Sequence, residues 1–305
     1  MASRRGPRDR APNLWRCWLF LPGAEKAALL AAARRGADVL IQELEDFTPP
    51  ERRAEARLLA PEIFARWREA GLLAAVRVNP LAGEGRADLA AVMRGRPDIV
   101  SLPKIAEPAQ VAALDAEVTR LERAYGIAEG STRLAPNIET ARGIMQTYAI
   151  AKASPRVVAV IGSTEDMAAD LNAERAPDGG ELWCARARLH LECRAAGVVS
   201  VDCPYTFADA KGAFSDARAA RRLGYPSKSA VLPAHVAIIN RVFTPSSAEV
   251  KSAQRVVAAF EAARAKGKVN VRLGARLVEL PIYLNAKRLL ERARLLGVGN
   301  VIRSV

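Results

Sequence analysis

Short apolar segments alternate with amphipathic stretches along most of the chain. The apolar segments are rich in Val, Ile and Leu and show no polar alternation, which is typical of strands buried on both faces by crossover helices. Eight such strands are predicted, over residues 18–22, 37–44, 73–78, 98–103, 133–138, 157–161, 198–202 and 229–232. Helices are predicted after six of them, over residues 25–35, 50–70, 109–125, 141–153, 181–196 and 209–223.

Eight strand units within about 235 residues predict an α/β fold of the (β/α)8 TIM-barrel type, which typically needs about 250 residues. A doubly wound open sheet is the alternative. That fold usually has fewer strands, and no G-x-G-x-x-G motif follows the first apolar segment here. We therefore expect a catalytic barrel domain over residues 14–240.

The pattern changes after about residue 240. Thr244-Pro245-Ser246-Ser247 is typical of a helix start, and the helix that follows is expected to reach about residue 266. A turn with a short extended piece (residues 267–280) and a last helix (residues 282–296) complete the chain. Residues 241–305 exceed what a barrel needs, so we predict a C-terminal helical extension that acts as a lid over its own barrel mouth or a neighbour's.

The N-terminal segment, residues 1–13, is rich in Arg, and Pro7 and Pro12 interrupt any amphipathic helix there. It has charge but no apolar stretch, so we do not expect it to be a secretory signal. We predict a disordered basic arm.

The chain is strongly basic, with a formal net charge of +13, and three interpretations stay open. The charge belongs to a solvated, Arg-rich surface, to a site for a phosphorylated small molecule, or to a nucleic-acid site. The third is disfavoured because the basic residues are spread along the chain and aromatic residues, at 5%, are too few for a base-stacking surface. We expect a small-molecule substrate and no nucleic-acid partner.

Cysteine usage and hydropathy indicate in which cellular compartment the protein is expected. No apolar run approaches the roughly 18 residues that cross a bilayer, so no membrane association is expected. None of the four cysteines belongs to a C-x-x-C pair, which predicts neither a structural zinc site nor a disulfide framework. This usage favours the reducing cytoplasm.

Two carboxylates are the most informative candidates for chemistry. Glu139 and Asp166 each follow an apolar strand and precede a helical stretch, and they are 27 residues apart, close to one strand–helix unit. If the two strands are neighbours in a parallel sheet, both acids lie at its carboxyl edge, where α/β proteins build their sites. Mg²⁺ prefers oxygen ligands and needs only one or two carboxylates, so the pair predicts a Mg²⁺ site, with Mn²⁺ as the alternative ion.

Several short motifs occur in a fixed order along the chain. They are RCWLFLPG (16–23), ELED (43–46), RVNP (77–80), LPK (102–104), IETARG (138–143), EDMAAD (165–170), Asp202 with Tyr205-Thr206, FTPS (243–246) and LVELP (277–281). Together they resemble the citrate lyase β-subunit-like family, which includes malyl-CoA lyases, within the HpcH/HpaI aldolase superfamily. The resemblance covers roughly residues 14–297.

This resemblance implies a TIM barrel that binds Mg²⁺ and cleaves or forms a carbon–carbon bond, with coenzyme A as part of the substrate. It implies that Glu139 and Asp166 hold the metal and that Arg77 binds substrate. It also implies a catalytic acid at Glu279, donated by a neighbouring subunit, and hence a homo-oligomer, a trimer or hexamer.

Other charged residues have two interpretations each. Arg77 holds a substrate carboxylate or stabilises an enolate oxygen, or it forms a structural ion pair. In one interpretation, the acids Glu43, Glu45 and Asp46 take part in catalysis or bind waters of the metal ion. In the other, they form an ion-pair cluster with Arg77 or Lys104. Glu45 and Asp46 are catalytic candidates. Lys104 and Arg16 are substrate-binding candidates, Arg16 together with Arg4 and Arg5 for the phosphates of coenzyme A.

The sequence also departs from the family pattern at three places. Glu43 stands where Asp is usual, Leu232 and His235 replace a His and a Gln, and Glu279 replaces an Asp. The leading hypothesis is a lyase that converts a 3-hydroxyacyl-CoA to an acyl-CoA and a 2-oxo acid such as glyoxylate. An aldolase on a free hydroxy-oxo acid, a thioester hydrolase and a non-catalytic barrel are the alternatives.

Overall fold

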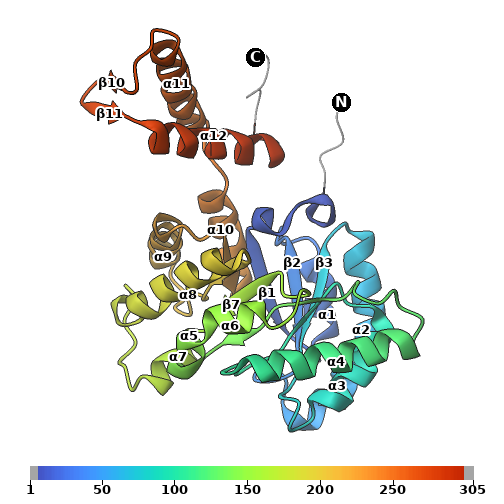
Figure 1. Cartoon of the computed structure of the whole chain (residues 1–305). Coiled ribbons are helices and arrows are strands. Elements are labelled where there is room, and N and C mark those ends of the chain that lie inside the picture. Colours follow the sequence, from blue (N-terminus) through green and yellow to red (C-terminus); the bar gives the residue numbers. More distant parts are fainter. Residues whose placement is uncertain (1–5, 299–305) are drawn as a thin grey trace. The chain divides into compact units, whose positions relative to one another are not determined.

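The computed structural model describes residues 6–298, which fall into two compact units, residues 6–240 and residues 241–298. The first unit is built on parallel strands surrounded by helices (Figure 1). Its strands are β1 (Cys17–Pro22), β2 (Val39–Glu43), β3 (Leu73–Arg77), β4 (Ile99–Ser101), β5 (Arg133–Leu134), β6 (Asn137–Ile138), β7 (Ala159–Gly162), β8 (Val199–Asp202) and β9 (Ser227–Ala230).

A strand that is split in two closes the ring. The strand order is β5-β4-β3-β2-β1-β9-β8-β7-β6, and the chain between β5 and β6 is only Ala135-Pro136. Ala135 N–H donates to Val100 O on one side, and Ile161 N–H donates to Pro136 O on the other, both at 2.9 Å. Residues 133–138 therefore act as one strand between β4 and β7, interrupted where proline lacks an N–H. The predicted eight-stranded TIM barrel is confirmed.

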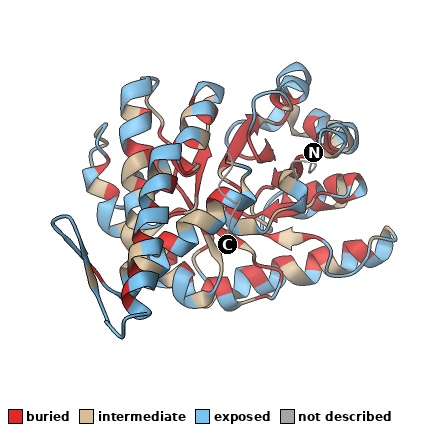
Figure 2. Ribbon diagram, turned by 90° about the horizontal axis from the view of Figure 1, so that it is seen from above, coloured by how far each residue is buried: buried red, intermediate tan, exposed pale blue. Residues whose placement is uncertain are grey.

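The predicted helices of the barrel are present, some as shorter pieces, together with others that the pattern did not indicate. The helices are α1 (Lys26–Ala32), α2 (Arg53–Glu69), α3 (Gly85–Val92), α4 (Pro108–Ala124), α5 (Ala141–Met145), α6 (Thr147–Lys152), α7 (Glu165–Asp170), α8 (Trp183–Ala196), α9 (Ala210–Leu223) and α10 (Val236–Phe243). The unpredicted helices, α3, α7 and α10, span eight residues or fewer, too few for the 3.6-residue period to show clearly. The strands of the barrel are almost wholly buried in Figure 2, whereas many helices are buried on one side only.

The barrel interior changes from apolar to polar along the strands. Its apolar core includes Trp18 and Phe20 of β1, Val39 and Ile41 of β2, and Leu73 and Ala75 of β3. Because side chains two residues apart share one face of a strand, the next inward positions are Glu43 and Arg77. By the same alternation, Asn137 and Glu139 follow Ala135 on the inner face of the barrel. Charged side chains thus form the layer above the apolar core, at the carboxyl ends of the strands.

Residues 6–14 are ordered by contacts at the amino end of the barrel. They contain two short 3-10 turns, η1 (Pro7–Asp9) and η2 (Pro12–Leu14). The Trp15 indole donates to Pro7 O at 3.0 Å, and Arg8 pairs with Asp98 at 2.5 Å. The structure differs here from the predicted disordered arm over residues 1–13, because these contacts fix the segment; residues 1–5 lie outside the described residues.

A buried cluster of four charges supports the β8 and β9 side of the barrel. Lys228 Nζ lies 2.6 Å from both Asp202 Oδ2 and Asp216 Oδ2, and Arg186 makes a two-pronged ion pair with Asp202 at 2.8 and 2.9 Å. Burial lowers the pKa of Lys228, but the two aspartates outweigh it and the net shift is upward, so Lys228 is charged. Its ammonium also donates to Cys203 O, just after the carboxyl end of β8.

The second unit has its own small core. It contains α11 (Ser247–Arg264), a hairpin of β10 (Val271–Leu273) and β11 (Arg276–Val278), and α12 (Leu280–Leu295). The rings of Phe260 and Tyr283 stack with centroids 4.7 Å apart, joining α11 to α12. Ser246 caps α11 in a capping box with Glu249, as the helix-start motif predicted. The lid function of this unit stays a prediction.

We expect Lys228→Ala to lower the free energy of unfolding by about 3–5 kcal/mol, because it leaves two buried aspartates with one cation between them. Urea unfolding followed by circular dichroism measures this. Lys26→Ala is the control, since it breaks an exposed pair with Glu62 and should cost less than about 1 kcal/mol. Equal losses in the two variants would contradict the importance of the buried cluster.

Candidate active site

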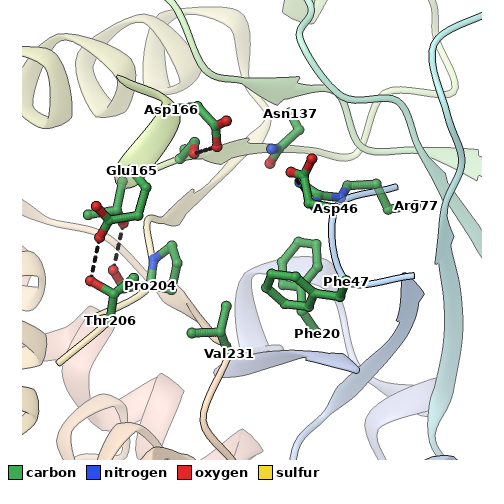
Figure 3. A pocket seen from close by; sticks show the side chains of 13 residues that line it. Phe20, Asp46, Phe47, Arg77, Asn137, Glu165, Asp166, Pro204, Thr206 and Val231 are labelled. Carbon is green, nitrogen blue, oxygen red and sulfur yellow. Dashed lines mark hydrogen bonds and ion pairs between the residues drawn. The ribbon is translucent and has the colours of Figure 1, made fainter. Parts of the chain in front are cut away.

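A pocket of about 330 Å³ opens at the carboxyl ends of the barrel strands. Seven of the eight strand positions contribute to its wall, either from the strand end or from the loop that follows. Its lining residues are Phe20, Asp46, Phe47, Arg77, Asn137, Gly162, Ser163, Thr164, Glu165, Asp166, Pro204, Thr206 and Val231. Figure 3 shows Asp166, Asn137, Asp46 and Arg77 along one side and Phe20, Phe47 and Val231 along the other.

Arg77 lies at the centre of the charged layer, surrounded by four carboxylates. Its Nε donates to Glu43 at 2.9 Å, and its terminal nitrogens lie 3.3 Å from Glu139, 3.2 Å from Asp46 and 3.4 Å from Glu45. Burial lowers the pKa of Arg77, but Glu43, Glu45 and Glu139 outweigh it and raise the pKa, so the guanidinium is permanently charged.

Lys104 supplies the second cation of this layer. Its Nζ lies 2.8 Å from Glu45 and 3.9 Å from Asp46. The Lys104 backbone has φ of +53°, a left-handed conformation that costs energy for a residue with a Cβ and that recurs at functional sites. Burial raises the pKa of Glu45, while Arg77 and Lys104 oppose that shift.

Glu139 is fully buried and incompletely satisfied. Its Oε1 accepts from Asn137 Nδ2 and contacts Arg77, whereas its Oε2 has no hydrogen-bond partner among the described residues. Burial is the largest cause that raises the pKa of Glu139, to about 7, and Asp166 and Glu45 add to the rise while Arg77 opposes it. Arg77 thus pairs with one oxygen of this carboxylate, while the other oxygen, Oε2, is left without a partner among the described residues.

Asp166 lies in the first turn of α7 and lines the pocket directly. Ser163 Oγ donates to Asp166 Oδ2 at 2.8 Å, which holds the side chain in place. Its charge acts on Glu139, so the two acids share one electrostatic environment. The sequence expectation that strand spacing brings these two residues to one edge holds in the structure, since β6 and β7 are paired neighbours.

The charge balance fits a divalent cation. Five carboxylates (Glu43, Glu45, Asp46, Glu139 and Asp166) surround two cations, Arg77 and Lys104, in this part of the described structure. Residues 6–298 contain no group of three or more His, Cys, Asp or Glu side chains placed to hold a metal. Two carboxylates with water suit Mg²⁺, which retains several waters when bound. The unpartnered Oε2 of Glu139 is the observation that fits such an ion.

The opposite wall of the pocket is apolar. The guanidinium carbon of Arg77 lies 5.2 Å from the Phe20 ring centroid and 5.9 Å from that of Phe47. Val231 packs against the barrel core beside them. This wall lowers the local dielectric next to the charges, which strengthens their action on a bound anion.

The structure does not bring the predicted substrate-binding residue Arg16 to this pocket, and Glu279 belongs to the second unit. Arg16 precedes β1, at the amino end of the barrel, where it pairs with Asp38 at 2.9 and 3.0 Å. Glu279 precedes α12 in the second unit, where it is exposed. Arg77, Glu45, Asp46, Lys104, Glu139 and Asp166 do gather in one place.

Sequence reasoning missed several pocket residues. Asn137 stands two positions before Glu139, so strand alternation alone placed it on the same face. Glu165 and Thr206 lie in recognised motifs but received no role; they form a hydrogen bond of 2.5 Å at the pocket rim, as Figure 3 shows. Phe47 lies in an irregular segment that carries no periodic signal. Val231 falls within the predicted strand over residues 229–232 but received no role; it directly follows β9 in the structure.

A sequence model described as HpcH/HpaI aldolase/citrate lyase matches residues 16–233, which include the whole pocket. This chain belongs to the HpcH/HpaI aldolase/citrate lyase family. It is therefore a carbon–carbon lyase by family, as the motifs predicted.

Relatives in the family span almost the whole chain. Citrate lyase subunit beta of Escherichia coli (strain K12) is 34% identical over 292 residues, covering 95% of this chain and 97% of that protein. An L-malyl-CoA/beta-methylmalyl-CoA lyase of Cereibacter sphaeroides is 33% identical, with 95% and 98% covered. The crystal structure of CitE from Mycobacterium tuberculosis with magnesium, acetoacetate and coenzyme A is 25% identical, with a TM-score of 0.75 and 94% and 99% covered.

We expect Mg²⁺ to bind about tenfold more weakly at pH 6 than at pH 8. The raised pKa of Glu139, about 7, means that the carboxyl keeps its proton below pH 7 and must lose it to hold the ion. Isothermal titration in buffers of different ionisation enthalpy measures both the affinity and the proton released.

Glu139→Gln is the matched control, because it cannot titrate and should show weak binding without that pH dependence. Equal Mg²⁺ affinity of the unsubstituted protein at pH 6 and pH 8 would exclude Glu139 as a ligand that titrates in this range.

Proposed function

We propose that this protein is a Mg²⁺-dependent lyase that converts a 3-hydroxyacyl-CoA to an acyl-CoA and a 2-oxo acid such as glyoxylate, or runs the reverse reaction. The observation that carries the proposal is the arrangement of Glu139 and Asp166 beside Arg77 at one pocket. A cation site adjacent to a fixed guanidinium suits a small acid with neighbouring oxygen atoms. The relative named as a malyl-CoA lyase, and the similar structure that holds magnesium, acetoacetate and coenzyme A, support the same substrate class.

Glu139 and Asp166 would hold the ion, and Mg²⁺ would supply a Lewis acid for the oxygen that changes between hydroxyl and carbonyl. Arg77 is proposed to hold the carboxylate of the 2-oxo acid, because its guanidinium presents two terminal nitrogens at the pocket. Asp46 lies on the wall next to Arg77 and is proposed to accept the hydroxyl proton, with Glu45 behind it.

Cleavage then breaks the carbon–carbon bond, and its electron pair stays with the acyl fragment as an enolate. A carboxylic acid must return a proton to that carbon. The apolar wall of Phe20, Phe47 and Val231 would exclude water around the enolate during this step.

An aldolase that acts on a free hydroxy-oxo acid is the second candidate. It is favoured by one observation: Leu232 and His235 stand where many members of the family carry a His and a Gln. His235 is buried, and neither ring nitrogen has a hydrogen-bond partner among the described residues.

The reaction is tested by incubating the protein with malyl-CoA-type esters and measuring both free acyl-CoA and 2-oxo acid, with Mg²⁺ and with EDTA. We expect equal amounts of the two products and no activity in EDTA. Glu139→Gln should lower kcat/KM by at least about 100-fold, on the order of 3 kcal/mol of barrier, whereas Glu62→Gln at the exposed Lys26 pair should have little effect.

Other product patterns distinguish the alternatives. Free coenzyme A without a 2-oxo acid would indicate thioester hydrolysis. Turnover of hydroxy-oxo acids with no effect of coenzyme A would indicate the free-acid aldolase. Absence of turnover with either substrate class would support a non-catalytic barrel.

We further propose that Glu279 is the acid that protonates the enolate, and that a neighbouring subunit donates it in a homo-oligomer. The support is the family resemblance of the LVELP segment, together with the exposure of Glu279 at the start of α12. Glu279→Gln should lower kcat by about 100-fold or more while KM changes little.

A mixture of Glu139→Gln and Glu279→Gln subunits tests donation between subunits, because hybrid oligomers regain some intact sites only if the two residues come from different chains. Sedimentation that shows only monomer, or a mixture that regains no activity, would contradict it.

A further inference from the structure

Glu43 lies beneath the pocket, outside the lining residues, and uses both of its carboxylate oxygens. Its Oε1 accepts from the Glu45 backbone N–H at 2.6 Å and from Arg77 Nε at 2.9 Å. Its Oε2 accepts from the Phe47 backbone N–H at 2.5 Å. The side chain is fully buried, so these three donors replace all of its hydration.

The segment after β2 depends on these bonds for its shape. Residues 44–48 form neither helix nor strand, yet they carry Glu45, Asp46 and Phe47 into the site. Thr48 closes the segment by donating to Glu43 O at 2.5 Å. Without the Glu43 carboxylate, the amides of Glu45 and Phe47 would lose their acceptors, which the barrel interior does not otherwise supply.

The same carboxylate orients Arg77. Glu43 and Arg77 are register partners on adjacent strands β2 and β3 and lie on the inner face. Because Glu43 takes the Nε edge of the guanidinium, the terminal nitrogens are left to face Glu139, Asp46 and the pocket. The buried Glu43 side chain therefore fixes both the orientation of Arg77 and the conformation of residues 44–48.

We infer that Glu43 is a positioning residue, which fixes both the direction of the Arg77 guanidinium and the conformation of residues 44–48. Its consequence for 2-oxo acid binding rests on the proposed function; its consequence for the segment does not. Aspartate is one methylene too short to reach all three donors. Glutamine keeps the length but presents an NH₂ group that cannot accept from a backbone amide.

Hydrogen exchange tests the effect on the segment. In Glu43→Gln, the amide of Glu45 or that of Phe47 should exchange at least about tenfold faster than in the unsubstituted protein, because the NH₂ group that replaces one carboxylate oxygen cannot accept from it. Glu62→Gln is the matched control and should leave them unchanged. Glu43→Asp keeps the charge and should give intermediate exchange. Unchanged exchange in Glu43→Gln would overturn the inference.

A double-mutant cycle tests the action through Arg77. Affinity for glyoxylate or pyruvate in the presence of Mg²⁺ should fall about 10–100-fold in Glu43→Gln and in Arg77→Met. The double variant should bind no more weakly than Arg77→Met alone, since Glu43 then has no guanidinium to orient. Losses that simply add would overturn the action of Glu43 through Arg77.

The two tests separate the failure modes. If the unsubstituted protein binds neither 2-oxo acid, the proposed function fails, and the exchange experiment still decides whether Glu43 shapes residues 44–48. If the unsubstituted protein binds a 2-oxo acid and Glu43→Gln binds it equally well, the inference fails while the proposed function stands.

Discussion

The burial of one guanidinium among several carboxylates is the constraint on which this site depends. Arg77 would be costly to bury alone, and each of Glu43, Glu45 and Glu139 would be costly to bury without it. The group is therefore stable only as a whole, with its members contributed by strand ends and loops far apart in sequence. Such mutual dependence keeps the side chains in place without a ligand, which is what a preorganised site needs.

The barrel separates two tasks along its axis. Apolar side chains on the inner faces of the strands pack the interior, and the following inward position on several strands is polar or charged. The strand pairing that stabilises the fold is also what fixes the spacing of Glu43, Arg77, Asn137 and Glu139. Chemistry at this end can vary by exchange of these side chains while the packed interior below them stays the same.

Much of this arrangement could be predicted from the sequence, because unbroken Val, Ile and Leu runs that mostly precede helices leave few alternatives to a barrel. The approach of Glu139 to Asp166 followed from strand–helix spacing alone. Arg16 shows where prediction from the sequence fails. It lies next to β1, but at the amino end of that strand, whereas the pocket lies at the carboxyl ends of the strands. The position of Phe47 was not predictable, since its segment is shaped by hydrogen bonds to a side chain rather than by a periodic pattern.

The division of one strand at Pro136 leaves a seam in the barrel. Hydrogen bonding on either side of the seam is carried by β5 with β4 and by β6 with β7, each over two residue pairs. Glu139 follows β6 and Asp166 follows β7, so an ion held by both would strengthen the short β6–β7 pairing on one side of this break. Occupancy of the site and closure of the ring would then reinforce each other, and heat resistance would rise with the supply of the ion.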